Sequence, residues 1–186
     1  MILGFSTSSE WTSTALFTPD GHMVDSEIEH APRRASETIW VQTERILARV
    51  GVELQGITGL MADTGPGSFT GVRVGVVFAK TLAFLSGVRC AGATAFDLIS
   101  PGALVSFPSK KGEFYVREIG QDLRVQTDFP ADAVGFGPGV AEPTYPSAAR
   151  FGDVFSRLNW VAPEAFLPEY VLPPSISLPK RPFRHV

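Results

Sequence analysis

The sequence has few of the features that mark secreted, metal-binding or nucleic-acid-binding proteins. Its 186 residues include one cysteine, Cys90, which excludes an internal disulfide and fits a reducing compartment. Its three histidines form no close spacing with cysteine, so no metal site is expected. The net charge of −3 gives no global field that would attract nucleic acid or an anionic membrane. With no basic N-terminal segment and no apolar run expected to reach a membrane span, the sequence predicts a cytoplasmic protein.

The composition is that of a globular α/β protein, with 44% hydrophobic and 19% charged residues. The first half predicts a three-strand meander followed by helix, strand, helix and strand: strands at 2–7, 12–17 and 22–30, a helix at 36–50, a strand at 57–62, a helix at 70–86 and a strand at 88–93. Pro101-Gly102 marks a candidate boundary. We therefore expect two lobes, residues 1–100 and a smaller lobe at 101–186 that ends in a proline-rich tail.

The second half repeats the pattern more faintly. Strands are expected at 103–107, 113–119 and 123–127, and a second glycine turn at 135–139. Two helical segments are expected at 145–158 and 164–167.

A glycine-rich stretch, Asp63 to Arg73, joins the strand at 57–62 to the helix at 70–86. Glycines allow backbone angles that a side chain forbids, and Ser68 or Thr70 can cap the helix. Such a turn directs amides and a helix N-terminus outward, which makes Gly65, Gly67, Ser68 and Thr70 a candidate anion-binding turn. The alternative is a tight connection with no ligand. No lysine follows Gly71 as a P-loop requires, and Ser68 lacks the flanking glycines of a nucleophile elbow.

The helix at 70–86 is apolar on nearly every face and carries a small-residue ridge of Gly71, Gly75, Ala79 and Ala83 at four-residue spacing. Such a ridge lets another backbone approach closely. Two interpretations remain open at this point: the ridge packs on this chain's own sheet, or another chain docks a helix there.

Several segments together resemble the TsaB (YeaZ) family. Gly65-Pro66-Gly67-Ser68-Phe69-Thr70-Gly71-Val72-Arg73 resembles the family's signature, and the opening residues 1–8 resemble its first strand. Residues 33–37, 111–116 and 168–172 resemble later family segments, so the likeness covers nearly the whole chain.

The resemblance implies an actin-like ATPase fold (ASKHA, RNase H-like) of two lobes, each built around a mixed five-stranded sheet, with the second lobe shortened here. It implies a non-catalytic partner in making threonylcarbamoyladenosine on tRNA, with no catalytic residue, no cofactor and no metal of its own. The implied partners are a TsaD-like catalytic subunit, a TsaE-like ATPase and a second copy of the chain when alone. tRNA would be met only through the complex.

The resemblance also implies that the two helices of the first lobe form the partner interface. The expected interface residues, drawn from both helices, are Trp40, Thr43, Leu47, Gly71, Val74, Gly75, Phe78 and Ala79.

The chain departs from the family where actin-like ATPases hold Mg-nucleotide. Ser6 replaces the usual aspartate after the first strand, Pro108 replaces a second, and Phe136 stands where an aspartate is common in the second glycine turn. A phosphate–metal site needs oxygen ligands, so these changes argue against bound Mg-nucleotide. The alternative, a stand-alone actin-like ATPase or nucleotide-binding protein, has Asp63 as its one carboxylate at the main turn.

Overall fold

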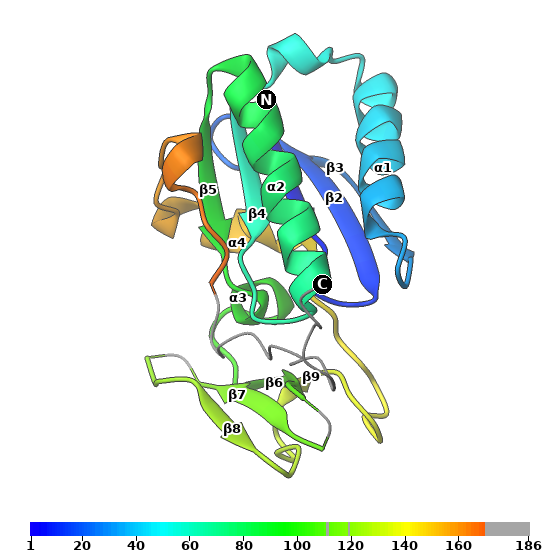
Figure 1. Ribbon diagram of the computed structural model, residues 1–186, viewed down its shortest axis with the longest axis vertical. Coiled ribbons are helices and arrows are strands. Elements are labelled where there is room, and N and C mark those ends of the chain that lie inside the picture. The colour runs from blue at the N-terminus through cyan, green and yellow to red at the C-terminus, as the bar shows by residue number, and fades with distance from the viewer. Residues whose placement is uncertain (111, 119, 170–186) are drawn as a thin grey trace, which may run out of the picture.

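The computed structural model describes residues 1–110, 112–118 and 120–169 and contains two sheets, seen one above the other in Figure 1. The larger sheet has the strand order β3-β2-β1-β4-β5. Its strands are β1 (Ile2–Ser6), β2 (Trp11–Phe17), β3 (Met23–His30), β4 (Gly59–Asp63) and β5 (Arg89–Ala93). β1 pairs antiparallel with β2 and parallel with β4, so the sheet is mixed. Every residue of β1 and β4 is buried, because both faces of this sheet are covered. The predicted meander and the two strands that follow it are confirmed.

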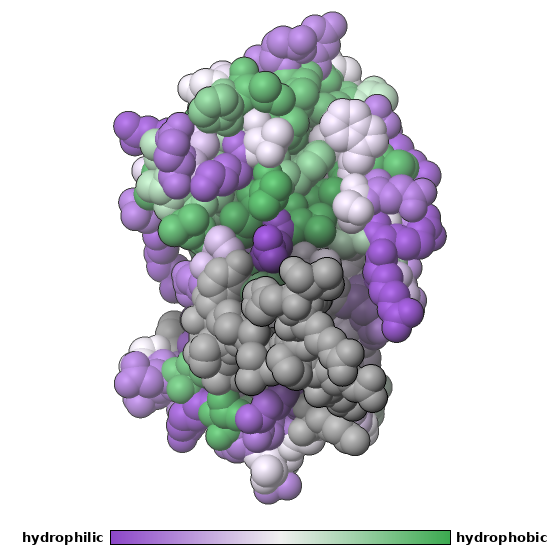
Figure 2. Space-filling view, viewed as in Figure 1, coloured by the Kyte–Doolittle hydropathy of each residue, from purple (hydrophilic) through white to green (hydrophobic). Residues whose placement is uncertain are grey.

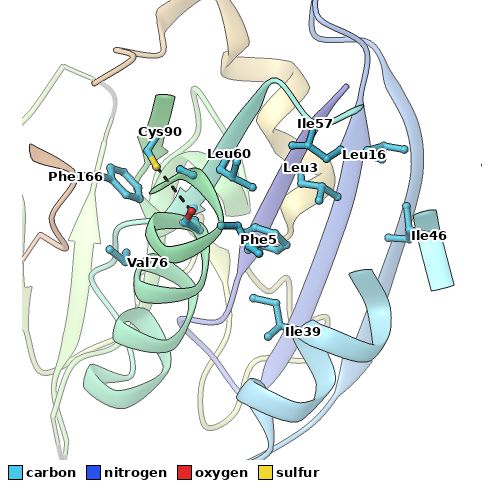
Figure 3. Close-up of a cluster of buried hydrophobic side chains, with 14 of the residues drawn as sticks. Leu3, Phe5, Leu16, Ile39, Ile46, Ile57, Leu60, Val76, Cys90 and Phe166 are labelled. Atoms are coloured by element: carbon cyan, nitrogen blue, oxygen red, sulfur yellow. Dashed lines mark hydrogen bonds between the residues drawn. The ribbon is translucent and has the colours of Figure 1, made fainter. Parts of the chain in front are cut away.

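Two long helices, α1 (Ala35–Val50) and α2 (Phe69–Ser86), cover one face of this sheet (Figure 1). α1 ends at Gly51, whose φ of 70° is the left-handed conformation that favours glycine at a helix end. α2 begins at Ser68, whose Oγ accepts a hydrogen bond from the Gly71 amide, as the sequence predicted for a cap. Between helices and sheet lies the main apolar core shown in Figure 3, which includes Leu3, Phe5, Leu16, Ile39, Ile46, Leu60 and Val76. The single cysteine, Cys90, is buried in it.

The small-residue ridge of α2 faces this chain's own sheet. A Cβ placed on Gly71 would lie 2.0 Å from the carbonyl oxygen of Thr7, and one on Gly75 would lie 2.5 Å from the Thr7 hydroxyl. Ala79 and Ala83 are fully buried in the same core. The glycines therefore let α2 lie directly on the end of β1, which favours the interpretation that the ridge packs on this chain's own sheet.

The expectation that no apolar run is long enough to span a membrane is wrong for α2. Its 18 residues, with a mean hydropathy of 1.4, are long and apolar enough to cross a membrane by length and composition. Seven of them nevertheless pack into the core of the lobe, and the helix carries Arg73 and Lys80. A core helix on a sheet meets the same composition test, and the packing of α2 is that of a core helix.

The opposite face of the large sheet is covered by residues 148–160, which come from the second half of the chain. Ala148, Phe151 and Val154 are buried against β1, β2 and β4 side chains such as Phe17 and Met61. Further on, the backbone of Val161 pairs with Cys90 at the edge of β5. The expected division at residue 100 therefore differs from the structure, because the chain builds the second sheet and then returns to the first.

The smaller sheet has the strand order β8-β7-β6-β9, with β6 (Val105–Pro108), β7 (Phe114–Arg117), β8 (Arg124–Gln126) and β9 (Val134–Gly135). Its described residues thus form four strands, where the resemblance implied five. It packs on the short helix α3 (Ala95–Ile99) through a separate core that contains Phe96 and Phe107.

The helix expected at 145–158 is broken into short pieces. Two 3₁₀ turns, η2 (Ala148–Arg150) and η3 (Phe155–Arg157), flank one turn of α-helix, α4 (Phe151–Val154). Another 3₁₀ turn, η4 (Pro163–Ala165), lies near the expected second helical segment. The part of the proline-rich tail from residue 170 onward is outside the described residues.

Candidate functional site

The glycine turn lies at the carboxyl end of β4 and is packed against the turn that follows β1. A Cβ on Gly67 would lie 2.4 Å from the carbonyl oxygen of Ser8, so glycine is required for this close approach. The Thr7 hydroxyl donates to the Gly71 carbonyl at 2.7 Å, which ties the same two segments together one turn later. The turn is thus held by the first strand rather than standing free.

Backbone amides of the turn are used within the chain. The Gly65 amide donates to Asp63 Oδ1 at 2.8 Å, and the Ser68 amide donates to the Ser8 carbonyl at 2.7 Å. The amides of Gly71 and Val72 donate to the side chain and the carbonyl of Ser68. Binding an anion would need free amides. The amides of Gly65 and Ser68 are therefore already paired within the chain, and the anion-binding role of Gly65, Gly67, Ser68 and Thr70 stays a prediction.

Asp63 is the acidic residue of the turn, and its carboxylate points into the protein. Its Oδ2 accepts hydrogen bonds from Ser6 Oγ at 2.8 Å and Ser8 Oγ at 2.5 Å. Burial raises the pKa of Asp63 to about 6, against the lowering effect of the hydrogen bonds from Ser8, Gly65 and Ser6. The charge of Asp97 on α3 raises it slightly further. Asp63 therefore joins β1, β4 and the glycine turn.

The raised pKa makes folding stability depend on pH, and we expect Asp63→Asn to remove that dependence. The folded state holds the Asp63 proton more tightly than the unfolded state, so this contribution is present below the unfolded value of 3.8 and is lost as pH rises through about 6. A shift of this size corresponds to about 3 kcal/mol. Urea unfolding from pH 4 to pH 7 should show the variant gaining stability relative to wild type by roughly that amount.

The exposed Asp132 supplies a matched control, because Asp132→Asn makes the same charge change away from the turn. A difference between wild type and Asp63→Asn that stays constant across this pH range would contradict the assignment.

A cavity of about 560 Å³ lies between the two lobes beside the glycine turn. One wall comes from the first lobe, with Ser8, Arg33 and Ser68, and the opposite wall comes from the second lobe and the loop after it. That second wall contains Phe107, Pro108, Phe136 and Tyr145. Pro108 and Phe136, which stand where the resemblance led us to expect aspartates, both line this cavity.

The residues present do not fit a Mg-nucleotide. Among the described residues that line the cavity, Glu10 is the one carboxylate, and it lies 3.3 Å from His30. Asp63 is turned away from the cavity, and no three acidic, histidine or cysteine side chains of the described chain lie together as metal ligands. Since Mg²⁺ prefers carboxylate and phosphate oxygens, this cavity offers the metal no adequate protein ligands.

The second candidate site is the outer face of the two helices. Trp40 of α1 meets Phe78 of α2 edge to face, with ring centroids 6.1 Å apart. Along α2, Val77, Phe84 and Leu85 are exposed, Phe84 by 68%. In Figure 2 hydrophobic residues gather over α2 in the upper part of the molecule, while the right-hand edge, where α1 lies, is largely hydrophilic. An apolar patch of this kind on a folded protein marks a surface for interaction.

Of the predicted interface residues, only Trp40 is strongly exposed. Val74, Phe78 and Leu47 are half-buried beside the core, whereas Thr43 is buried and donates its hydroxyl to the Ile39 carbonyl. Gly71, Gly75 and Ala79 lie on the buried side of α2, which faces the sheet. The prediction omitted Val77, Phe84 and Leu85. Helical geometry could have found the first two, because they lie on the side of α2 opposite to the ridge.

Comparisons with known proteins find similarity to two kinds of tRNA-modification protein, TsaD and TsaB. Residues 22–100 match the family model described as TsaD, tRNA N6-adenosine threonylcarbamoyltransferase. The tRNA threonylcarbamoyladenosine biosynthesis protein TsaB of Escherichia coli is 32% identical over 130 residues, which cover 65% of this chain and 55% of that protein. The TsaB of Haemophilus influenzae is 30% identical over 69% of this chain and 57% of that protein. The chain thus matches little more than half the length of these relatives.

Solved structures show the same fold. The structure titled YeaZ from Pseudomonas aeruginosa matches 91% of this chain and 99% of its own length, with a TM-score of 0.70 and 21% sequence identity. The two-lobed arrangement described here is therefore that of the YeaZ structure, and the mixed α/β fold class expected from the sequence is confirmed.

Proposed function

We propose that the chain is a member of the TsaB (YeaZ) family and a non-catalytic partner subunit in tRNA N6-threonylcarbamoyladenosine modification. In this role it docks on a TsaD-like catalytic subunit. The observation that carries the proposal is the exposed apolar face of α1 and α2, which occurs in a chain similar to named TsaB proteins.

We place the docking surface on the outer side of the two helices. Trp40, Val77 and Phe84 expose large apolar area there. Val74 and Phe78 are half-buried beside the core, and the Phe78 ring contacts Trp40 of α1. A partner helix pair could bury this area as one continuous apolar contact. A second copy of the chain would use the same face when the catalytic subunit is absent.

A supporting rather than catalytic role agrees with the cavity between the lobes, whose described lining contains one carboxylate, Glu10, and no cluster of metal-binding side chains. tRNA would be contacted through the complex, because the chain has a net charge of −3. A TsaE-like ATPase would supply nucleotide hydrolysis to the complex, and the setting would be the cytoplasm.

The size of the cavity, about 560 Å³, favours a second candidate function, that of a nucleotide-binding protein or stand-alone ATPase. We expect no magnesium-dependent ATP hydrolysis above a protein-free blank, because Asp63 is the one acidic group of the turn and faces inward. Phosphate release measured with purified protein, ATP and Mg²⁺ decides the point. Turnover that disappears in Asp63→Asn would support the enzyme instead.

The partner role is tested by mixing the purified chain with the TsaD-like subunit of the same organism and separating the mixture by size. We expect one complex that elutes ahead of either protein alone, and threonylcarbamoyl transfer to tRNA that requires this chain. Two separate peaks, together with transfer that proceeds equally well without the chain, would reject the proposal.

A further inference from the structure

Six rings form a continuous column from the core of the second lobe to the edge of the first sheet. In order they are Phe96, Phe107, Phe136, Tyr145, Trp11 and His30, with successive ring centroids 4.7, 5.6, 4.6, 5.6 and 5.3 Å apart. All five separations lie within the range of attractive aromatic contacts. We call this set the aromatic column.

The aromatic column crosses the junction between the two lobes. The backbone passes from the second lobe to the first at nearly the same place. Phe107 lies on β6 and Phe136 directly follows β9, so both lie in the second lobe. Trp11 opens β2 of the first sheet. Tyr145 stands between them, just after the Thr144 amide donates to the Gly135 carbonyl in the second lobe. Three residues later, the Ala148 amide donates to Ser13 Oγ on β2.

Polar contacts support the column at both ends. The Tyr145 hydroxyl donates to Glu10 at 3.4 Å, and Glu10 also lies 3.3 Å from His30. At the other end, the Arg117 guanidinium lies 4.6 Å from the Phe96 ring centroid and pairs with Asp97 at 2.9 Å. Because Arg117 is on β7 and Asp97 is on α3, this ion pair ties the second sheet to the helix that follows β5.

We propose that the aromatic column fixes the angle between the two lobes, so that the chain moves as one rigid body. Opening the lobes would separate Tyr145 from Trp11 or from Phe136 and would expose their ring faces to water. Phe136, at a position where a carboxylate would serve a nucleotide site, instead supplies a central ring of this contact. The inference does not depend on the partner proposed above.

The proposal is tested by measuring the distance between the lobes with spin labels. Glu44→Cys on α1 and Val125→Cys on β8 provide exposed label sites on the two lobes, while the native Cys90 is buried. We expect a single narrow distance distribution in the otherwise wild-type protein. Tyr145→Ala removes two ring contacts and should raise the population of other lobe angles by roughly 5- to 150-fold, which broadens the distribution.

Three further variants make the result specific. Tyr145→Phe keeps the ring and should remain narrow, while Trp11→Leu breaks the column at its next ring and should broaden it. Phe129→Ala removes an edge-to-face contact with Phe114 inside the second lobe, outside the column, and should leave the distance unchanged. Narrow, wild-type distributions in both Tyr145→Ala and Trp11→Leu would overturn the proposal.

Discussion

Gly71→Ala should destabilise the protein by about 1–3 kcal/mol, even though alanine is the better helix former. The added methyl group would lie 2.0 Å from the Thr7 carbonyl oxygen, which is backbone and cannot rotate away. Relief requires α2 to move off the end of β1, with loss of the hydrogen bond from the Thr7 hydroxyl to the Gly71 carbonyl. Thermal unfolding should show a fall in melting temperature of about 2–12 °C.

Thr81→Ala is the matched control, because residue 81 is exposed on the same helix and gains helix propensity without a clash. It should melt at or slightly above the wild-type temperature. If Gly71→Ala instead kept its melting temperature but lost its oligomeric state or its partner, the ridge would serve another chain and not this sheet.

Phe84→Asp should have the opposite profile, with stability retained and partner binding lost. The side chain is 68% exposed, and exposed substitutions usually change stability by no more than about 0.5 kcal/mol. In a docked complex the same position would bury a charge in an apolar contact. Losing a central aromatic anchor typically costs at least about 2 kcal/mol, or roughly 30-fold in affinity. Titration against the TsaD-like subunit measures this loss.

Val125→Asp places the same charge on an exposed apolar position of β8, in the other lobe, and should bind the partner like wild type. Equal affinity for wild type and Phe84→Asp would show that the outer face of α2 is not the docking surface. If Phe84→Asp lost partner binding and its melting temperature also fell, the loss of binding would result from impaired folding.

Much of the first lobe can be predicted from the sequence because its signals are local. The turn residues Pro19-Asp20-Gly21 separate β2 from β3, and Gly51 ends α1. The all-apolar character of α2 favours a helix buried on all sides, but in the structure one side packs on the sheet while Val77, Phe84 and Leu85 are exposed. Which side packs on the sheet depends on the contact of Gly71 with Thr7, 64 residues apart in the chain.

The candidate site was harder to predict for the same reason. The glycine stretch is that of an anion-binding turn when considered alone. In the fold, the Ser8 carbonyl takes the Ser68 amide, and the serines at 6 and 8 turn Asp63 inward. No local pattern in the sequence predicts that residues 148–160 return to the first sheet. These residues form only short helical turns, and their burial depends on strands far away in the sequence.

That return has a consequence for how the protein is made. Synthesis runs from the N-terminus, so β1 to β5 and both long helices leave the ribosome before most of the cover on one face of their sheet is made. Ala148, Phe151 and Val154, which bury that face, are made only after the whole second sheet. The first lobe therefore begins to form early but is completed late. Its uncovered apolar face must be protected from aggregation until residues 148–160 have been synthesised.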